Sequence, residues 1–166
     1  FAQAHDITKP GLVYSDDKIK VYAAENSHYQ TFDAGQDKSY AYRFETPGRT
    51  VVFTGDSGPS DSLTELAKGA DVLVTEVIDS EEAVRIAAAD MHISPEGQQH
   101  LADHMRHEHL SPEEVGKMAA KAGVKMVVLT HIAPSDGSEP DASRFTTGVK
   151  RYFSGPVIAG RDLLEL

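Results

Sequence analysis

The first third of the chain alternates apolar and polar residues with the two-residue period of β-strands. Short alternating runs bounded by turn residues predict two β-hairpins, with turns at Ser15-Asp16-Asp17 and Pro47-Gly48. The polar stretch 25–39 between the hairpins is expected to be irregular. The predicted strands lie at residues 11–14, 18–24, 40–46 and 50–54.

Beyond residue 60 the pattern changes to helices that alternate with strands. Ser111 is a predicted N-cap, with a proline at the first helical position, a capping-box Glu114 and a C-cap at Gly123. A loop is expected at 133–141. The predicted helices are 62–69, 80–90, 94–106, 111–123 and 144–153, and the predicted strands are 71–77, 125–130, 155–159 and 163–166.

This element order favours an α/β (α+β) fold. An antiparallel start followed by α/β alternation predicts a mixed sheet with helices packed on one face. The 166 residues fit a single domain spanning the whole chain, 1–166.

The composition narrows the class of protein. A content of 40% hydrophobic and 25% charged residues is ordinary for a globular protein, and no apolar run could cross a bilayer. We therefore expect a soluble protein of the cytoplasm or periplasm with no membrane partner. The net charge of −10, without a cluster of Lys and Arg, disfavours a nucleic-acid partner bound through a basic face. The absence of cysteine excludes thiol catalysis and cysteine zinc sites. The eight histidines instead favour a metal site with histidine and carboxylate ligands.

Candidate ligands follow the predicted strands. Asp56 lies in the turn that ends strand 50–54, Glu76 ends the next strand, and His131 follows strand 125–130. His28 lies in the irregular stretch, and His109 precedes the Ser111 helix. Open α/β sheets place their chemistry at the carboxyl ends of strands, and divalent metals take imidazole and carboxylate ligands from several such ends. The alternative is a capping role for Asp56 and surface positions for the histidines.

Four segments carry a family resemblance. Together they resemble the C-terminal half of a metallo-β-lactamase-fold hydrolase of the ribonuclease Z and arylsulfatase-like branch, and the match extends from about Val21 to the end of the chain. The resemblance implies the βα half of an αββα sandwich. The segments are Val-Val-Phe-Thr-Gly-Asp-Ser-Gly-Pro-Ser (51–60), Leu-Ala-Lys-Gly-Ala-Asp-Val-Leu-Val-Thr-Glu-Val (66–77), His-Leu-Ser-Pro-Glu-Glu-Val-Gly (109–116) and Val-Val-Leu-Thr-His (127–131).

The resemblance also implies roles for the candidate residues. His28 matches a ligand of the first metal, Asp56 the carboxylate that bridges two metals, and His131 the last ligand of the second metal. His109 matches the histidine that contacts the scissile group and can protonate the leaving oxygen, and Glu76 matches the acidic residue that orients it. The implied cofactor is a pair of Zn²⁺ ions per intact site, with Mn²⁺ or Fe as alternatives.

Two departures from the family pattern affect the predicted function. Thr75 stands where ribonuclease Z usually has histidine, which weakens an assignment to transfer-RNA processing. The family signature His-x-His-x-Asp-His is absent, and the nearest string, 107–111, lacks its Asp-His. A private metal site of His104, His107 and His109 is less favoured than a solvated helix end.

The missing signature and the start at Phe1 suggest a piece of a longer enzyme or one part of a complex. One half of the sandwich would expose an apolar sheet face, so the expected partner is the N-terminal half of the same fold or a homodimer mate.

We predict a metal-dependent hydrolase in which a metal-bound hydroxide attacks a phosphodiester, sulfate ester or related ester bond of a small-molecule or nucleotide substrate. The alternative is a catalytically incomplete fragment or a non-catalytic interaction module, and we expect this chain by itself to bind metal weakly. A nucleotide-binding domain is disfavoured because Gly55-Asp56-Ser57-Gly58 lacks both the Gly-x-Gly-x-x-Gly spacing and a Walker lysine.

Overall fold

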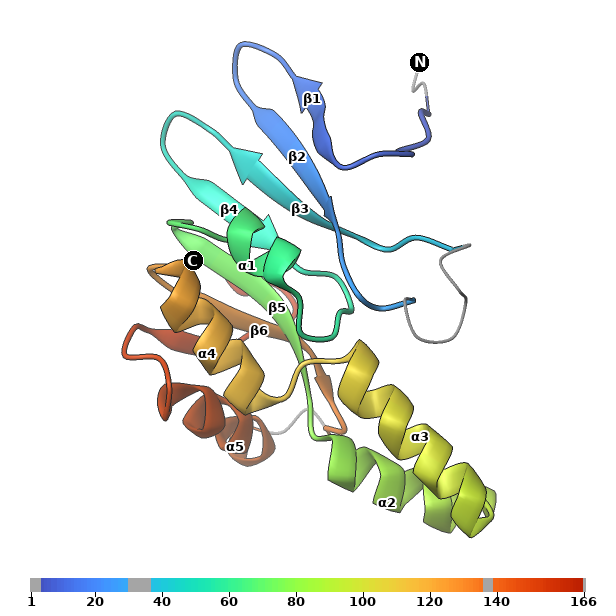
Figure 1. The fold of residues 1–166 in the computed structure, drawn as a ribbon. Coiled ribbons are helices and arrows are strands. Elements are labelled where there is room, and N and C mark those ends of the chain that lie inside the picture. Colours follow the sequence, from blue (N-terminus) through green and yellow to red (C-terminus); the bar gives the residue numbers. More distant parts are fainter. Residues whose placement is uncertain (1–3, 30–36, 136–138, 166) are drawn as a thin grey trace.

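The computed structural model describes residues 4–29, 37–135 and 139–165. Within these residues the chain forms one mixed sheet of seven strands, whose order in the sheet is their order in the sequence (Figure 1). Part of the predicted irregular stretch, residues 30–36, lies outside the described residues.

The antiparallel half of the sheet confirms the two predicted hairpins. Each strand pairs antiparallel with the next, and the Asp16 carboxylate closes the first turn by accepting the backbone N–H groups of Lys18 and Ile19. The strands are β1 (Gly11–Ser15), β2 (Lys20–Glu25), β3 (Tyr40–Glu45) and β4 (Thr50–Phe53).

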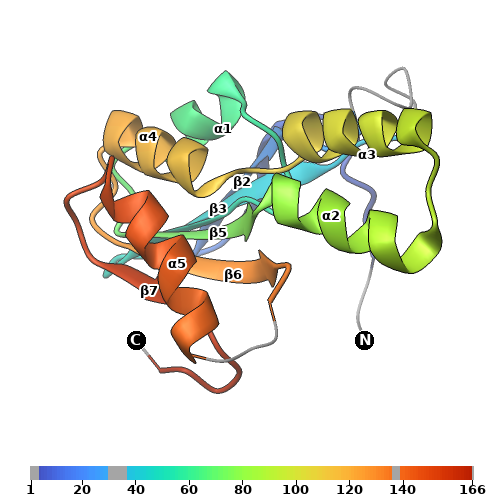
Figure 2. The same ribbon diagram turned by 90° about the horizontal axis from the view of Figure 1, so that it is seen from below.

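The remaining strands continue the sheet in parallel from β4. They are β5 (Val72–Ile78), β6 (Val127–Ala133) and β7 (Val157–Ala159). Helices α1 (Asp61–Leu66), α4 (Pro112–Ala122) and α5 (Glu139–Lys150) connect them. Helix α4 contacts both α1 and α5, so the three form one layer on one face of the sheet (Figure 2). Successive parallel crossovers that run in one direction along a sheet and share one handedness place their helices on the same face.

The hydrophobic core lies between this helical layer and the sheet. Alternate strand residues such as Val52, Leu73 and Leu129 are fully buried there against Leu63 of α1 and Val115 of α4. The residues between them face the other side, where Phe53 is 44% exposed and packs edge-on against Phe44. The helices therefore cover one face of the sheet, as predicted. The expectation that a partner covers the other face remains a prediction.

A helical hairpin is inserted between β5 and α4. It consists of α2 (Ser80–Met91) and α3 (Pro95–Glu108), which contact each other and project beyond the sheet (Figures 1 and 2). No residue of α2 is buried, whereas the last residue of α3, Glu108, is 1% exposed. The C-terminal end of α3 is thus the part of the hairpin that is anchored to the body. None of the helices in the described part of the chain has the length and apolarity needed to cross a bilayer.

Two predicted helices and the predicted last strand differ from the structure. Helix α1 ends at Leu66 rather than at Gly69, which has φ +63°. Helix α5 runs over 139–150 rather than 144–153, so it takes in part of the predicted loop. The predicted last strand does not form at 163–165, since Leu163 has φ +61°, which is incompatible with an extended strand.

The capping box of α4 allows a test of how strongly local sequence stabilises a helix start. The Ser111 hydroxyl accepts the Glu114 N–H at 3.3 Å, and the Glu114 carboxylate accepts the Ser111 N–H at 2.8 Å. Ser111→Ala should lower the free energy of unfolding by about 1 kcal/mol, measured by urea denaturation. Ser154→Ala, at an exposed site, is the control and should change it by less than about 0.5 kcal/mol. Equal effects of the two substitutions would contradict the capping role.

Candidate metal centre

Asp56 lies in the turn that follows β4. The backbone of Thr54 is still tied to the sheet through its N–H, which donates to Val74 O at 3.0 Å. Gly55 then takes φ +60°, a left-handed conformation that a glycine adopts without steric cost, and turns the chain out of the strand. The turn leaves the Asp56 carboxyl half-buried at the carboxyl end of the parallel strands, where the sequence predicted it.

His131 reaches the same place through a β-bulge. The predicted strand ended at residue 130, but β6 continues to Ala133 with His131 inside it. Thr75 pairs with Leu129 and Val77 with Ile132, so β6 carries one extra residue opposite Glu76. His131 has φ +43° at this point, and its Nε2 lies 3.6 Å from Asp56 Oδ2. The bulge re-aims this side chain, a common use of bulges near functional sites.

Glu76 is a buried carboxylate that joins two loops. It is 1% exposed and lies in β5. Its Oε1 accepts the backbone N–H of Ser57 at 2.5 Å, and its Oε2 accepts His109 Nδ1–H at 2.8 Å. Both oxygens are thereby used, and the turn that carries Asp56 is connected to the segment that carries His109. A charge buried this deeply is tolerated because it is paired and hydrogen-bonded.

His109 lies between α3 and α4 and is 7% exposed. Burial by itself would lower the pKa of His109, but the hydrogen bond with Glu76 and the negative charges of Glu76, Asp56 and Glu108 outweigh it. The pKa of His109 therefore lies above its usual value of 6.5. The protonated imidazole is favoured at this position.

His28 is oriented by a backbone carbonyl. Its Nδ1 lies 3.1 Å from the main-chain oxygen of Glu108. Because a carbonyl only accepts hydrogen bonds, Nδ1 carries the proton and Nε2 keeps its lone pair for another partner. The His28 ring meets the His109 ring edge-on, with centroids 5.0 Å apart. A carbonyl that fixes the tautomer of a histidine in this way is typical of metal sites.

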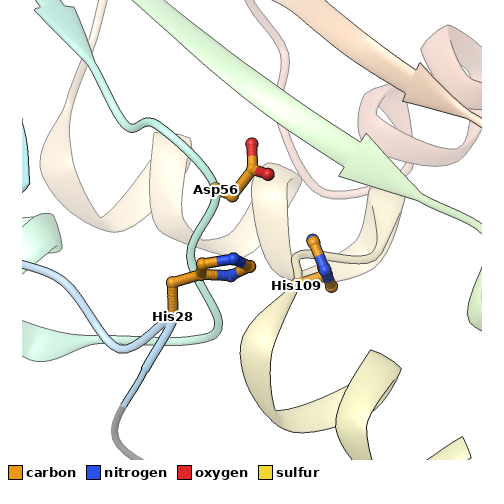
Figure 3. Close-up of side chains that lie close together, drawn as sticks. All are labelled: His28, Asp56 and His109. Carbon is orange, nitrogen blue, oxygen red and sulfur yellow. The ribbon is translucent and has the colours of Figure 1, made fainter. Parts of the chain in front are cut away.

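All five residues that the sequence singled out converge. Two groups of potential ligand atoms each lie within 4.8 Å of one another: His28, Asp56 and His109 in one (Figure 3), and Asp56, Glu76 and His131 in the other. Asp56 belongs to both groups. Imidazole and carboxylate donors with one shared carboxylate fit a pair of borderline divalent ions such as Zn²⁺.

Comparisons with known proteins bear on this arrangement. The family model for the beta-lactamase superfamily domain matches residues 2–132. The chain belongs to the beta-lactamase superfamily. Ribonuclease Z of Mycobacterium tuberculosis is 30% identical over 161 residues, which cover 97% of this chain and 52% of that enzyme. The chain thus spans about half the length of the curated relatives that it matches.

Solved structures show that the fold is the metallo-β-lactamase fold. The metallo-β-lactamase fold protein YhfI from Bacillus subtilis superposes with a TM-score of 0.63 at 22% identity, over 96% of this chain and 52% of YhfI. The short form of human tRNase Z superposes with a TM-score of 0.54 at 19% identity, over 92% of this chain and 43% of that protein. The α/β fold and the family resemblance inferred from the sequence are confirmed.

The sequence did not single out three polar residues that border this superfamily site. Asn26 and Ser57 are buried within the loops that carry His28 and Asp56, and Glu108 is buried beside His109. One Glu108 oxygen lies 3.2 Å from His104 Nδ1. Only burial and contact mark these residues. In the described part of the chain, neither ligand group includes His104 or His107.

Gly58 sets how closely α3 approaches the Asp56 turn. A Cβ added there would lie 1.7 Å from the carbonyl oxygen of His107, a backbone atom that cannot move without displacing the end of α3. Gly58→Ala should lower the free energy of unfolding by about 1–3 kcal/mol, the usual cost of overpacking, measured by urea denaturation. The matched control is Gly48→Ala, where an added Cβ meets nothing within 4 Å. A neutral Gly58→Ala would mean that this contact is not tight.

The raised pKa of His109 predicts a pH dependence of stability in the metal-free chain. His109 is more basic in the folded than in the unfolded state, so its stabilising effect is fully present below its unfolded pKa of about 6.5. The effect is lost as pH rises through the higher folded pKa. The difference in unfolding free energy between the unaltered chain and His109→Gln should therefore shrink from pH 6 to pH 9. A difference that grows with pH would contradict the pKa direction.

Proposed function

We propose that this chain contributes half of the active site of a binuclear metal-dependent hydrolase that cleaves phosphodiester bonds. The observation that carries the proposal is that Asp56 belongs to both groups of potential ligands. One carboxylate with two oxygens can hold two cations close together and offset their repulsion. Zn²⁺ is the proposed ion because it accepts this mixture of imidazole and carboxylate donors.

The proposed ligands are the atoms that hydrogen bonds leave available. His28 would bind the first ion through Nε2, since its Nδ1 donates to the Glu108 carbonyl. His131 would bind the second, and Asp56 both. Glu76 is not proposed as a ligand because each of its oxygens accepts a short hydrogen bond. When bound, the metal pair supplies an activated water at neutral pH and positive charge for the attacked phosphoryl oxygen.

His109 is proposed as the general acid. Its Nδ1–H donates to Glu76, which leaves Nε2 as the nitrogen for a substrate. Glu76 fixes the ring through a second anchor, the Ser57 N–H, so the imidazole and the Asp56 turn keep their relative position. In the metal-free chain the hydrogen bond to Glu76 helps to raise the pKa of His109, and a protonated imidazole can donate to the oxygen of a departing group.

The substrate class follows from the relatives. Both ribonuclease Z and tRNase Z are named for cleaving RNA, and on this basis we favour a phosphodiester over a sulfate ester. The expectation that nucleic acid is disfavoured rested on the net charge of −10 and the lack of a basic cluster. The names of the relatives oppose that expectation, so RNA is included among the proposed substrates. A basic RNA-binding surface would then come from a partner or another part of the protein.

Substitutions in a protein that joins this chain to the preceding half of the fold test the proposal. Asp56→Ala and His109→Ala should each lower kcat on bis(4-nitrophenyl) phosphate by at least about 100-fold, because the first removes the bridge and the second the proton donor. His107→Ala is the control: it is exposed and two residues from His109, and it should leave kcat within about twofold. Wild-type turnover by Asp56→Ala would contradict the proposed hydrolase activity.

The zinc content of the purified protein distinguishes this proposal from the alternative hypothesis of a non-catalytic module. Mass spectrometry should find zinc in the joined protein and should find that Asp56→Ala has lost it. This chain by itself should hold less than stoichiometric zinc, because three ligands fall short of a two-metal site. A joined protein without zinc would favour the module.

A further inference from the structure

Asn26 is the only asparagine among the 166 residues, and it is 1% exposed. It follows β2 directly and lies two residues before His28. A buried amide at the entrance to a loop must be hydrogen-bonded to be tolerated, so its partners indicate its role.

The Asn26 amide joins the loop of His28 to the turn of Asp56. Its Nδ2 donates to the carbonyl of Thr54 at 2.9 Å, and its Oδ1 accepts the backbone N–H of His28 at 3.2 Å. Thr54 lies two residues before Asp56, and its own N–H is fixed to β5. Through these bonds one buried side chain spans two segments that are 28 positions apart.

We infer that Asn26 is a positioning residue that sets the separation of His28 and Asp56. The inference rests on the proposed function, in which these two residues hold the first metal ion. An amide fits because one contact requires a donor and the other an acceptor within a single short side chain. Aspartate would place an oxygen against the Thr54 carbonyl, and alanine would leave both backbone groups without this partner.

A second contact of His28 in the described part of the chain acts on its ring. The Glu108 carbonyl orients the imidazole, whereas Asn26 holds the backbone from which the imidazole extends. Loss of Asn26 should therefore leave the ring able to bind zinc but no longer held at the proper distance from Asp56. Residues that orient metal ligands typically change metal affinity by about 10- to 100-fold when replaced.

The test compares the zinc affinity of the joined protein described above with that of its variants, by competition with a chromophoric chelator. Asn26→Ala and the nearly isosteric Asn26→Asp should weaken zinc binding by about 10- to 100-fold. Val149→Ala is the control. Val149 is fully buried in α5 and belongs to neither group of potential ligands, so truncating its side chain should lower Tm without touching the site. This control should keep zinc affinity within about twofold, which separates positioning from general destabilisation.

A second readout needs no metal. In the zinc-free chain, hydrogen exchange at the His28 amide should accelerate by about tenfold or more in Asn26→Ala, because Oδ1 no longer accepts it. If the joined protein binds no zinc, the proposed function is contradicted and this exchange rate decides the role of Asn26. Unchanged exchange, or wild-type zinc affinity in folded Asn26→Ala and Asn26→Asp, would overturn the inference. Should Asn26→Ala fail to fold, Asn26→Asp carries the affinity test.

Discussion

The double hydrogen bond of the Glu76 carboxylate is the interaction on which the site depends. A buried, ionised carboxylate is costly unless its oxygens are satisfied, and here one accepts the Ser57 N–H and the other the His109 ring. The requirement to satisfy both oxygens fixes the turn after β4 and the segment before α4 against the central strand β5. Removing either partner would leave a buried charge half-paired, so the same bonds that stabilise the fold also hold the site together.

Close packing of backbone on backbone extends this constraint to the helical hairpin. Gly58 lets the His107 carbonyl approach the Asp56 turn more closely than a side chain would permit. The end of α3 is thereby held where Glu108 can offer its carbonyl to His28 and where His109 meets Glu76. The rest of the hairpin projects from the body with few buried residues, so its anchored end is the part that acts on the site (Figure 1).

The proposed ligands are thus positioned by partners of different kinds. The Asp56 turn is tied to β5 through Thr54, His131 is re-aimed by a bulge, and His28 is held by a backbone carbonyl on its ring and an amide on its N–H. Each of these contacts is made within the chain, so the proposed ligands are held in place without a bound metal ion. Such preorganisation limits the reorganisation required on metal binding.

The sequence by itself determined the features that are encoded over a few residues. Alternation predicted the hairpins, Ser111 and Glu114 predicted the start of α4, and the family motifs indicated the five residues that the structure brings together. Only the tertiary structure decided the bulge at His131, the close approach at Gly58 and the bridge made by Asn26. Caps and strand periodicity depend on neighbouring residues, whereas these contacts join residues 28 or more positions apart. Their geometry exists only once the sheet and the helices have packed.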